Sequence, residues 1–92
     1  MCTEPVTWEK SSEMMKSDDY KERFIAEYAQ TRIRYERLKA YCNRIEAACQ
    51  YMTDVEEPPH TCPFELLREQ QHIMGNYLHV LEVRAVIEGI KF

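Results

Sequence analysis

The sequence predicts an all-α protein, built as a long antiparallel helical hairpin with a short N-terminal arm, that assembles into a helical oligomer. The first observation is composition: 2 glycines and 4 prolines in 92 residues are too few for a turn-rich β protein. The second is that apolar side chains recur every three or four residues in two long stretches. The third is a proline-rich break between those stretches. A chain of this length forms one small domain, which excludes a large enzyme with a separate cofactor domain.

Residues 1–17 are expected to form an arm outside the hairpin. This stretch is polar and contains Pro5 and a pair of serines. Its apolar side chains show no clear helical period, namely Val6, Trp8, Met14 and Met15. We therefore expect a flexible tail or a short docking segment, in which Trp8 either covers a pocket or has no role.

The first long helix is expected over about residues 18–52. Asp18 and Asp19 stand at its start, where carboxylates can accept hydrogen bonds from free amide groups and suit the helix dipole. No proline or glycine follows before Pro58, so the helix can extend for about 50 Å at 1.5 Å per residue. Its seam is expected to consist of Phe24, Tyr28, Thr31, Tyr35, Leu38, Cys42, Ile45, Cys49 and Met52.

The chain is expected to turn at about residues 53–62. Pro58 and Pro59 remove amide donors and disfavour a helical conformation in the residues before them. Pro63 suits the first turn of a second helix, with Thr61 or Cys62 as its cap. The chain therefore returns along the first helix after this break.

The second helix is expected over residues 63–88, with Gly89 as its carboxyl cap and a short apolar end at 90–92. Gly75 lies inside it, at a cost of about 1 kcal/mol relative to alanine, and either permits a close helix approach or is simply tolerated. One apolar stripe can face the first helix: Leu67, Met74, Leu78, Leu81 and Ala85. An adjoining stripe consists of Leu66, Ile73, Tyr77, Val80 and Ile87.

A two-helix hairpin can cover only one of these stripes. The adjoining stripe, together with Ile25, Tyr41 and Phe92, would stay exposed in a monomer. Exposed apolar surface of that extent marks an interface, and a hairpin alone has little core. We therefore predict a homo-oligomer.

Charge and composition exclude several classes of partner. Twelve Lys and Arg against 16 Asp and Glu give a net charge of -4, which argues against direct DNA binding through the whole surface. No run approaches the roughly 20 apolar residues of a membrane span, and no signal-peptide pattern opens the chain. We expect a cytoplasmic protein, in which the cysteines Cys2, Cys42, Cys49 and Cys62 act as small hydrophobic residues.

Catalytic patterns are weak, so we expect no enzymatic activity, no metal and no cofactor. His72 and His79 share a helical face but stand two turns apart, too far for one metal ion without a third ligand. Glu65 and Glu69 lack the Glu-x-x-His spacing of di-iron bundles. The sequence also contains no nucleophile elbow and no glycine-rich phosphate loop.

The segment TRIRYERLK at residues 31–39 reverses the overall charge locally. Four basic residues and one acidic residue give it a charge of +3. Arginine grips phosphate with two hydrogen bonds, and the tyrosines nearby can stack on bases, a combination that nucleotide ligands require. A solvated helix flank with its tyrosines in the seam is the alternative interpretation.

Two segments carry a resemblance to known proteins. They are DYKERFIAEYAQTRIRYERLKAY, and CPFELLREQQHIMGNYLHVLEVRAVIEGI after the proline break. Together, over residues 18–90, they resemble small helical-hairpin proteins of gut Firmicutes phages and crAss-like phages. The shared plan has a tyrosine and an arginine on helix one, here Tyr20 and Arg23, and a return helix LLxEQxxxMxxYLxxLExR. The matching positions of the return helix are Leu66, Leu67, Glu69, Gln70, Met74, Tyr77, Leu78, Leu81, Glu82 and Arg84.

More distantly, the chain is similar to the hairpin of phage anti-CBASS and anti-Thoeris sponges. Those proteins assemble as oligomers and sequester cyclic nucleotide immune signals without cleaving them. The resemblance implies pockets between subunits, lined by an aromatic residue of helix one and a basic residue about four turns later. Tyr20 and Arg34 match these positions, and an arginine stands where the sponge pattern has a lysine.

The leading hypothesis is a phage anti-defence protein in the host bacterial cytoplasm that captures a cyclic nucleotide or an ADP-ribose-derived signal between subunits. In it, Tyr20 and Tyr28 stack on bases, whereas Arg23, Arg34 and Arg84 hold phosphates. One alternative is a protein inhibitor of a host defence nuclease, similar to an anti-CRISPR, that uses acidic residues such as Asp54, Glu56 and Glu57. Another is a structural coiled-coil adaptor.

Overall fold

The computed structural model describes residues 6–51 and 54–92, which form three helices and no strand. They are α1 (Trp8–Met14), α2 (Tyr20–Gln50) and α3 (Phe64–Glu88). The all-α class is therefore confirmed. The first five residues of the arm, with Cys2 and Pro5, lie outside the described residues, as does the end expected for the first helix at Met52. Within the described ranges, no helix combines the length and apolar character needed to cross a membrane.

Helix α2 begins where the sequence places its capping acid. Asp19 is the N-cap, and its carboxylate accepts a hydrogen bond from the Lys21 amide at 3.0 Å. This bond satisfies one of the amide groups that a helix start leaves without a partner. The helix then continues for 31 residues, so it begins two residues later than expected and ends at Gln50.

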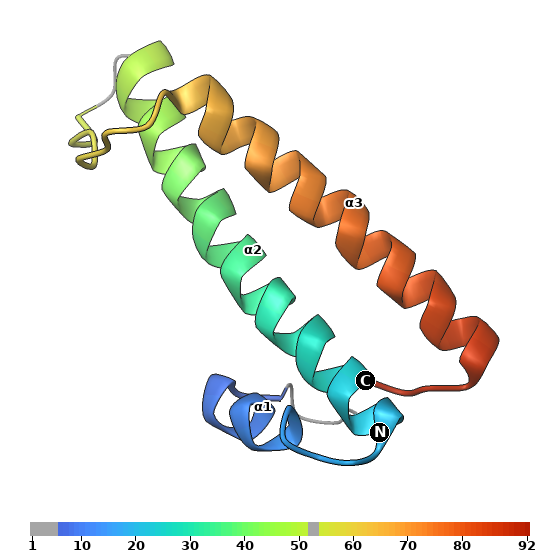
Figure 1. The fold of residues 1–92 in the computed structure, drawn as a ribbon. Helices are drawn as coiled ribbons and strands as arrows, with labels where there is room; N and C mark the ends of the chain where they lie inside the picture. The colour runs from blue at the N-terminus through green and yellow to red at the C-terminus, as the bar shows by residue number, and fades with distance from the viewer. Residues whose placement is uncertain (1–5, 52–53) are drawn as a thin grey trace.

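Helices α2 and α3 form an antiparallel hairpin (Figure 1). Hydrogen bonds between their side chains join early residues of α2 to late residues of α3. Nearer the loop, a late residue of α2 pairs with an early residue of α3. The donors and acceptors are Arg84 to Tyr20, Tyr77 to Glu27, Tyr28 to Glu82 at 2.6 Å and Arg68 to Glu46 at 2.9 Å. Polar contacts therefore support the hairpin along much of its length.

The expected seam supplies much of the core, but not all of it. Phe24, Cys42 and Ile45 are buried on α2, and Leu78, Leu81 and Ala85 are buried on α3. Burial raises the pKa of the Cys42 thiol, as expected of a cysteine that acts as a small hydrophobic residue. The same expectation is wrong for Cys49 and Cys62, which are exposed because they lie at the loop end of the hairpin.

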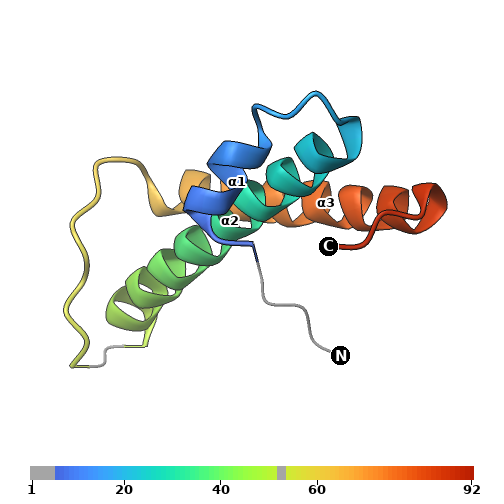
Figure 2. The same ribbon diagram turned by 90° about the horizontal axis from the view of Figure 1, so that it is seen from below.

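Helix α1 lies within residues 1–17, where the sequence pattern does not predict a helix. Thr7 caps it by accepting a hydrogen bond from the Lys10 amide at 3.2 Å. The helix packs beside the N-terminal half of α2 (Figure 2). Ser11 is fully buried there, and its hydroxyl donates to the Trp8 carbonyl at 2.7 Å.

Two small residues of α2, Ala26 and Ala29, lie away from the core that α2 shares with α3. Ala26 and Ala29 are buried. Ala26 lies about 200° around the helix from Phe24, which belongs to the core cluster with α3. Of the described elements, α1 is the other helix that contacts α2. Small side chains let the two helices approach closely, and such residues give a weak apolar signal in the sequence.

The two ends of α3 differ in how well the sequence predicts them. The expected cap at Thr61 or Cys62 is wrong: Pro63 is the N-cap, and no side chain caps the helix. The Pro63 carbonyl instead accepts hydrogen bonds from the amides of Leu66 and Leu67, at 3.1 and 3.2 Å. The reason is that Pro63 is still extended, with ψ of 142°, so the helix begins one residue later.

At the carboxyl end, Gly89 is the predicted cap. Its φ of 70° lies in the left-handed region, which a residue without a side chain adopts most easily. The turn lets the Ile90 amide donate to the Ala85 carbonyl at 2.8 Å and buries Ile90 in the core. The last residues thereby return toward the start of α2 (Figure 1).

The adjoining stripe of α3, Leu66, Ile73, Tyr77, Val80 and Ile87, is exposed in the single chain. We call it the outer stripe. Its five side chains are between 42% and 77% exposed. The expectation that Ile25 and Tyr41 would also be exposed is wrong, since both are half-buried. Ile25 packs against the core, and Tyr41 donates to the Pro59 carbonyl of the loop.

Candidate functional site

Aromatic side chains gather where the start of α2 meets the end of α3. Phe92 stacks on Phe24, with 5.8 Å between ring centroids, and on Tyr28, with 3.8 Å. Tyr20 is tilted against Phe24 at 6.1 Å. The positive φ of Gly89 makes this packing possible, because it turns the C-terminal residues back toward α2. With Arg84, these residues form what we call the aromatic–arginine cluster: Tyr20, Phe24, Tyr28, Arg84 and Phe92.

Arg84 is the cation of this cluster. Its guanidinium carbon lies 4.9 Å from the centroid of the Phe24 ring, a favourable cation–π distance. The same guanidinium donates to the Tyr20 hydroxyl and forms an ion pair with Glu88 at 3.1 Å. The Arg84 side chain is nevertheless 45% exposed. It is therefore held in position while part of it stays accessible to an anion.

A groove of about 260 Å³ lies beside the cluster, between α2 and α3. Tyr28 belongs both to the groove and to the cluster. The lining residues are Tyr28, Arg32, Tyr35 and Glu36 from α2, and Gly75, Leu78, His79 and Glu82 from α3. The groove thus presents two tyrosines, one arginine, two carboxylates and one imidazole.

Gly75 shapes this groove. A Cβ atom at that position would lie 3.1 Å from Cε1 of Tyr35, closer than an ordinary van der Waals contact. The missing side chain therefore lets the Tyr35 ring lie directly against α3. Of the two interpretations of Gly75 that the sequence left open, the structure favours a close approach, here between a ring and a helix.

The electrostatics of the groove keep Tyr28 neutral. Burial, followed by the hydrogen bond to Glu82, raises the pKa of Tyr28 to about 12. The hydroxyl therefore stays protonated at neutral pH and donates to the Glu82 carboxylate at 2.6 Å. Arg32 opposes this shift through its charge but does not outweigh it. The Tyr28 ring is consequently anchored at both its face and its hydroxyl.

The five predicted site residues are only partly brought together. Tyr20, Tyr28 and Arg84 share the aromatic–arginine cluster. Arg23 instead donates to the Ser17 carbonyl at 2.7 Å, in the connection before α2. Arg34 is exposed on α2, 14 residues after Tyr20, a distance of about 21 Å along the helix. Within one chain, Arg34 and Tyr20 therefore lie at well-separated levels of α2.

Several residues of this region are not among the predicted site residues. Phe24 belongs to the predicted seam and Phe92 to the predicted apolar end, and in the structure both hold the cluster together. Arg32 and Arg34 both belong to the basic segment at 31–39. Arg32 lines the groove, and Arg34 does not line it. Helical spacing from Tyr28 was an available signal, because Arg32 is one turn away on the same face.

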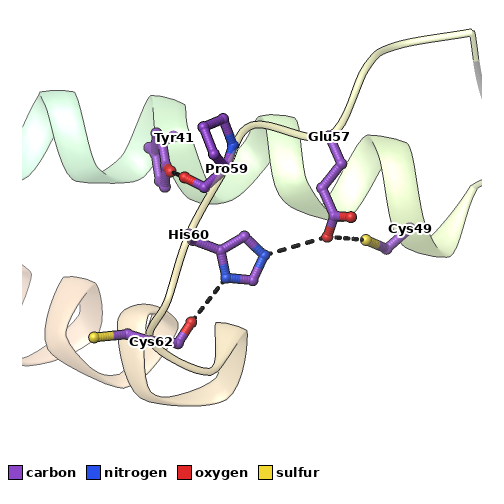
Figure 3. A network of polar contacts seen from close by, with 6 residues as sticks. All are labelled: Tyr41, Cys49, Glu57, Pro59, His60 and Cys62. Atoms are coloured by element: carbon purple, nitrogen blue, oxygen red, sulfur yellow. Dashed lines mark hydrogen bonds and ion pairs between the residues drawn. The ribbon is translucent and has the colours of Figure 1, made fainter.

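A second polar network lies at the loop end of the hairpin (Figure 3). Glu57 accepts hydrogen bonds from the Cys49 thiol at 2.8 Å and from Nε2 of His60 at 3.2 Å. Nδ1 of His60 lies 2.8 Å from the Cys62 carbonyl oxygen. Because a carboxylate and a carbonyl both accept, this geometry requires a proton on each ring nitrogen. The network is therefore formed by the imidazolium form of His60.

The pKa shifts of His60 and Glu57 agree with this assignment, because both shifts favour the charged form. The Cys62 carbonyl and then Glu57 raise the pKa of His60 above its usual 6.5. Cys49 and then His60 lower the pKa of Glu57 below 4.5. The hydrogen bond to Glu57 raises the pKa of the Cys49 thiol, which makes that thiol less reactive at neutral pH.

Beside this network, a hollow of about 500 Å³ is lined by Tyr41, Pro59, His60, Thr61, Cys62 and Leu67. Over residues 6–51 and 54–92, no three side chains of His, Cys, Asp or Glu come together as a possible metal site. We regard the loop network as a support for the turn between α2 and α3.

The network predicts a pH-dependent loop. A raised His60 pKa contributes stability that is complete below pH 6.5 and is lost as the pH rises through the folded-state value. A lowered Glu57 pKa contributes stability above pH 4.5 that is lost on acidification. Amide protection of residues 54–63, measured by hydrogen exchange, should therefore be greatest at about pH 4.5–6.5 and should decline toward pH 8. His60→Gln, which cannot titrate, is the control, and an equal decline in that variant would contradict the assignment.

No curated protein and no solved structure matches this chain. A family model does match: the model described as Sequestin aligns with residues 18–87. The matched segment covers more than half of the chain and includes all of α2, the loop and nearly all of α3. The family name indicates a sequestering function and identifies no ligand. By this match, the chain belongs to the Sequestin family.

Proposed function

We propose that this protein sequesters a nucleotide-derived immune signal, a cyclic oligonucleotide or an ADP-ribose derivative, by binding it between subunits of a homo-oligomer. We also propose that the ligand is released unchanged, that the protein is encoded by a phage, and that it acts in the cytoplasm of the host bacterium. Membership of the Sequestin family supports the sequestering role. The observation that carries the choice of ligand is the aromatic–arginine cluster.

The cluster combines the two groups that a nucleotide needs. Aromatic faces stack on bases, with a contribution of about 1–3 kcal/mol per base, and arginine pairs with phosphate through two parallel hydrogen bonds. Tyr20 is 44% exposed and lies beside the partly exposed Arg84. The groove next to the cluster adds Arg32 and the ring of Tyr35. Base stacking by Tyr20 and Tyr28, with phosphate binding by Arg84 and Arg32, is the arrangement that we propose.

The size of the groove and the position of Arg34 support the proposal that the ligand binds between subunits. The groove of about 260 Å³ falls below the usual 300–1,000 Å³ of small-molecule pockets, so one chain alone encloses too little of a cyclic dinucleotide. Arg34 is exposed and far from Tyr20 on the same helix. A neighbouring subunit could bring its own Arg34 to the cluster, which would reconcile the position of this residue with a role in phosphate binding.

The test is isothermal titration against cyclic dinucleotides, cyclic trinucleotides and cyclic ADP-ribose isomers. We expect saturable binding of one of these classes, and intact ligand in the supernatant after the protein is denatured by heat. Tyr20→Ala should weaken binding by at least about tenfold, which corresponds to 1.4 kcal/mol, whereas Tyr20→Phe keeps the ring and should bind within a few-fold of the unaltered protein. Arg44→Ala, an exposed arginine outside the cluster, is the matched control for Arg84→Ala.

The absence of any binding heat, released or absorbed, across the whole panel would reject the nucleotide proposal. Recovery of a hydrolysed product would reject sequestration without cleavage. Equal binding by Tyr20→Ala and the unaltered protein would place the ligand elsewhere on the chain.

The alternative of an acidic protein inhibitor gains no support from the loop. It depended on Asp54, Glu56 and Glu57, and the Glu57 carboxylate is already engaged by Cys49 and His60. We therefore propose no role for this acidic segment in partner binding.

A further inference from the structure

Four residues of the outer stripe of α3 recur at a regular spacing and remain exposed in the single chain. Leu66, Ile73, Val80 and Ile87 recur every seven residues, and their side chains are 54%, 59%, 52% and 77% exposed. They lie on a different face from the buried residues of the same helix, such as Leu78 and Leu81. A seven-residue apolar repeat over the whole length of a helix is typical of a surface that packs against another helix.

Two charged residues on this face make the pattern symmetric. Glu69 lies three residues after Leu66, and Arg84 lies three residues before Ile87. The six positions are 66, 69, 73, 80, 84 and 87. The intervals between them are the same whether they are read from Leu66 or from Ile87, and the centre lies between Asn76 and Tyr77. At 100° per residue, these six positions fall within a sector of about 60° of the helix surface. They form one narrow face.

We propose that α3 pairs with α3 of a second copy of this chain, antiparallel, across this face. A two-fold axis at the centre of the pattern brings Leu66 level with Ile87 of the second copy, and Ile73 level with Val80. It also brings Glu69 level with Arg84 of the second copy. Each chain thus offers apolar residues to apolar residues and a carboxylate to a guanidinium.

Charge selects this orientation over the other one. Glu69 is exposed and forms no ion pair with any described residue, while Arg84 keeps 45% of its side chain exposed. A parallel pair in register would place Glu69 against Glu69 and Arg84 against Arg84, and like charges in contact are unfavourable. The antiparallel pair turns the same four side chains into two ion pairs.

The pairing would give the aromatic–arginine cluster a residue from a second chain. Arg84 belongs to the cluster, so Glu69 of the second copy would lie at its edge. The pairing itself does not depend on the proposed function. The inference rests on the proposed function only where it gives the interface a role in ligand binding. The mass of the assembly is measured without nucleotide, so either proposal can fail while the other holds.

The experiment is light scattering coupled to size-exclusion chromatography, with circular dichroism to check that each variant is helical. The chain has a mass of 11.0 kDa, and we expect about 22 kDa or an even multiple of the chain mass, in keeping with paired symmetry. Ile73→Asp and the single charge exchanges Glu69→Arg and Arg84→Glu should each halve the mass or reduce it further and leave the helix content unchanged. Arg44→Glu, the same change at an exposed arginine of α2, should leave the mass unchanged.

The decisive variant is the double charge exchange Glu69→Arg with Arg84→Glu. In the antiparallel pair it restores both ion pairs, so it should recover the mass that each single exchange loses. A monomer at the highest concentration measured would overturn the proposal. So would an oligomer whose mass is unaffected by Ile73→Asp, or a double exchange that remains as dissociated as the single ones.

Discussion

Replacing Phe24 with alanine should lower the free energy of unfolding by about 3–5 kcal/mol, the range for removing a buried aromatic ring. Phe24 is 3% exposed and forms one buried cluster with Leu81, Ala85 and Ile90. Its ring also stacks on Phe92 and lies beneath the Arg84 guanidinium. Removal of the ring would therefore leave a cavity and separate the C-terminal residues from α2.

Urea unfolding followed by circular dichroism, at one fixed protein concentration, measures this loss. Phe24→Leu keeps most of the apolar volume and should cost clearly less. Val86→Ala removes a side chain that is 82% exposed, so it should change stability by no more than about 0.5 kcal/mol. A Phe24→Ala protein as stable as the Val86→Ala protein would contradict the packing described for this end of the hairpin.

The second large effect is expected at the other half of α2. Ile45 is 1% exposed and is among the largest fully buried side chains. Ile45→Ala should therefore lower the free energy of unfolding by about 2–5 kcal/mol, because the transfer of the lost atoms and the remaining cavity both destabilise the fold. Ile45 lies far along α2 from the aromatic–arginine cluster, so nucleotide binding by the folded variant should be unchanged.

Ile45→Val is the matched variant, since it removes a single methylene group and should cost about 0.5–1.5 kcal/mol. The same urea titration provides the comparison. Equal stability of the alanine and valine variants would mean that the site collapses around the smaller side chain, and that the hairpin is not closely packed at this level.

Several features of the fold could be predicted because their causes are local. Asp19 caps α2 through an amide two residues away, and Gly89 ends α3 because it can adopt a positive φ. The exposure of the outer stripe also follows from its helical position, since α2 covers one face of α3 only. The two caps depend on residues within about one helical turn of each other.

The errors have a common origin in packing between elements. Helix α1 packs against α2, where small residues such as Ala26 are buried. Alanines give only a weak apolar periodicity, so the sequence does not predict this packing. Cys49 follows the seam spacing but is exposed, because the seam extends into the loop end of the hairpin. Periodicity shows which face of a helix can be buried, and it does not show how far along the helix a partner extends.

By itself, the sequence determined the helical class, the proline break and both caps at Asp19 and Gly89, since these follow from backbone preferences and hydrogen bonds over a few residues. Only the tertiary structure decided which functional candidates meet. Tyr20 and Arg84 are 64 residues apart in the chain and share a hydrogen bond, whereas Arg34, in the same basic segment as Arg32, lies outside the groove. The physical reason is that such contacts depend on the register of two helices, which is set by the packing of all their side chains together.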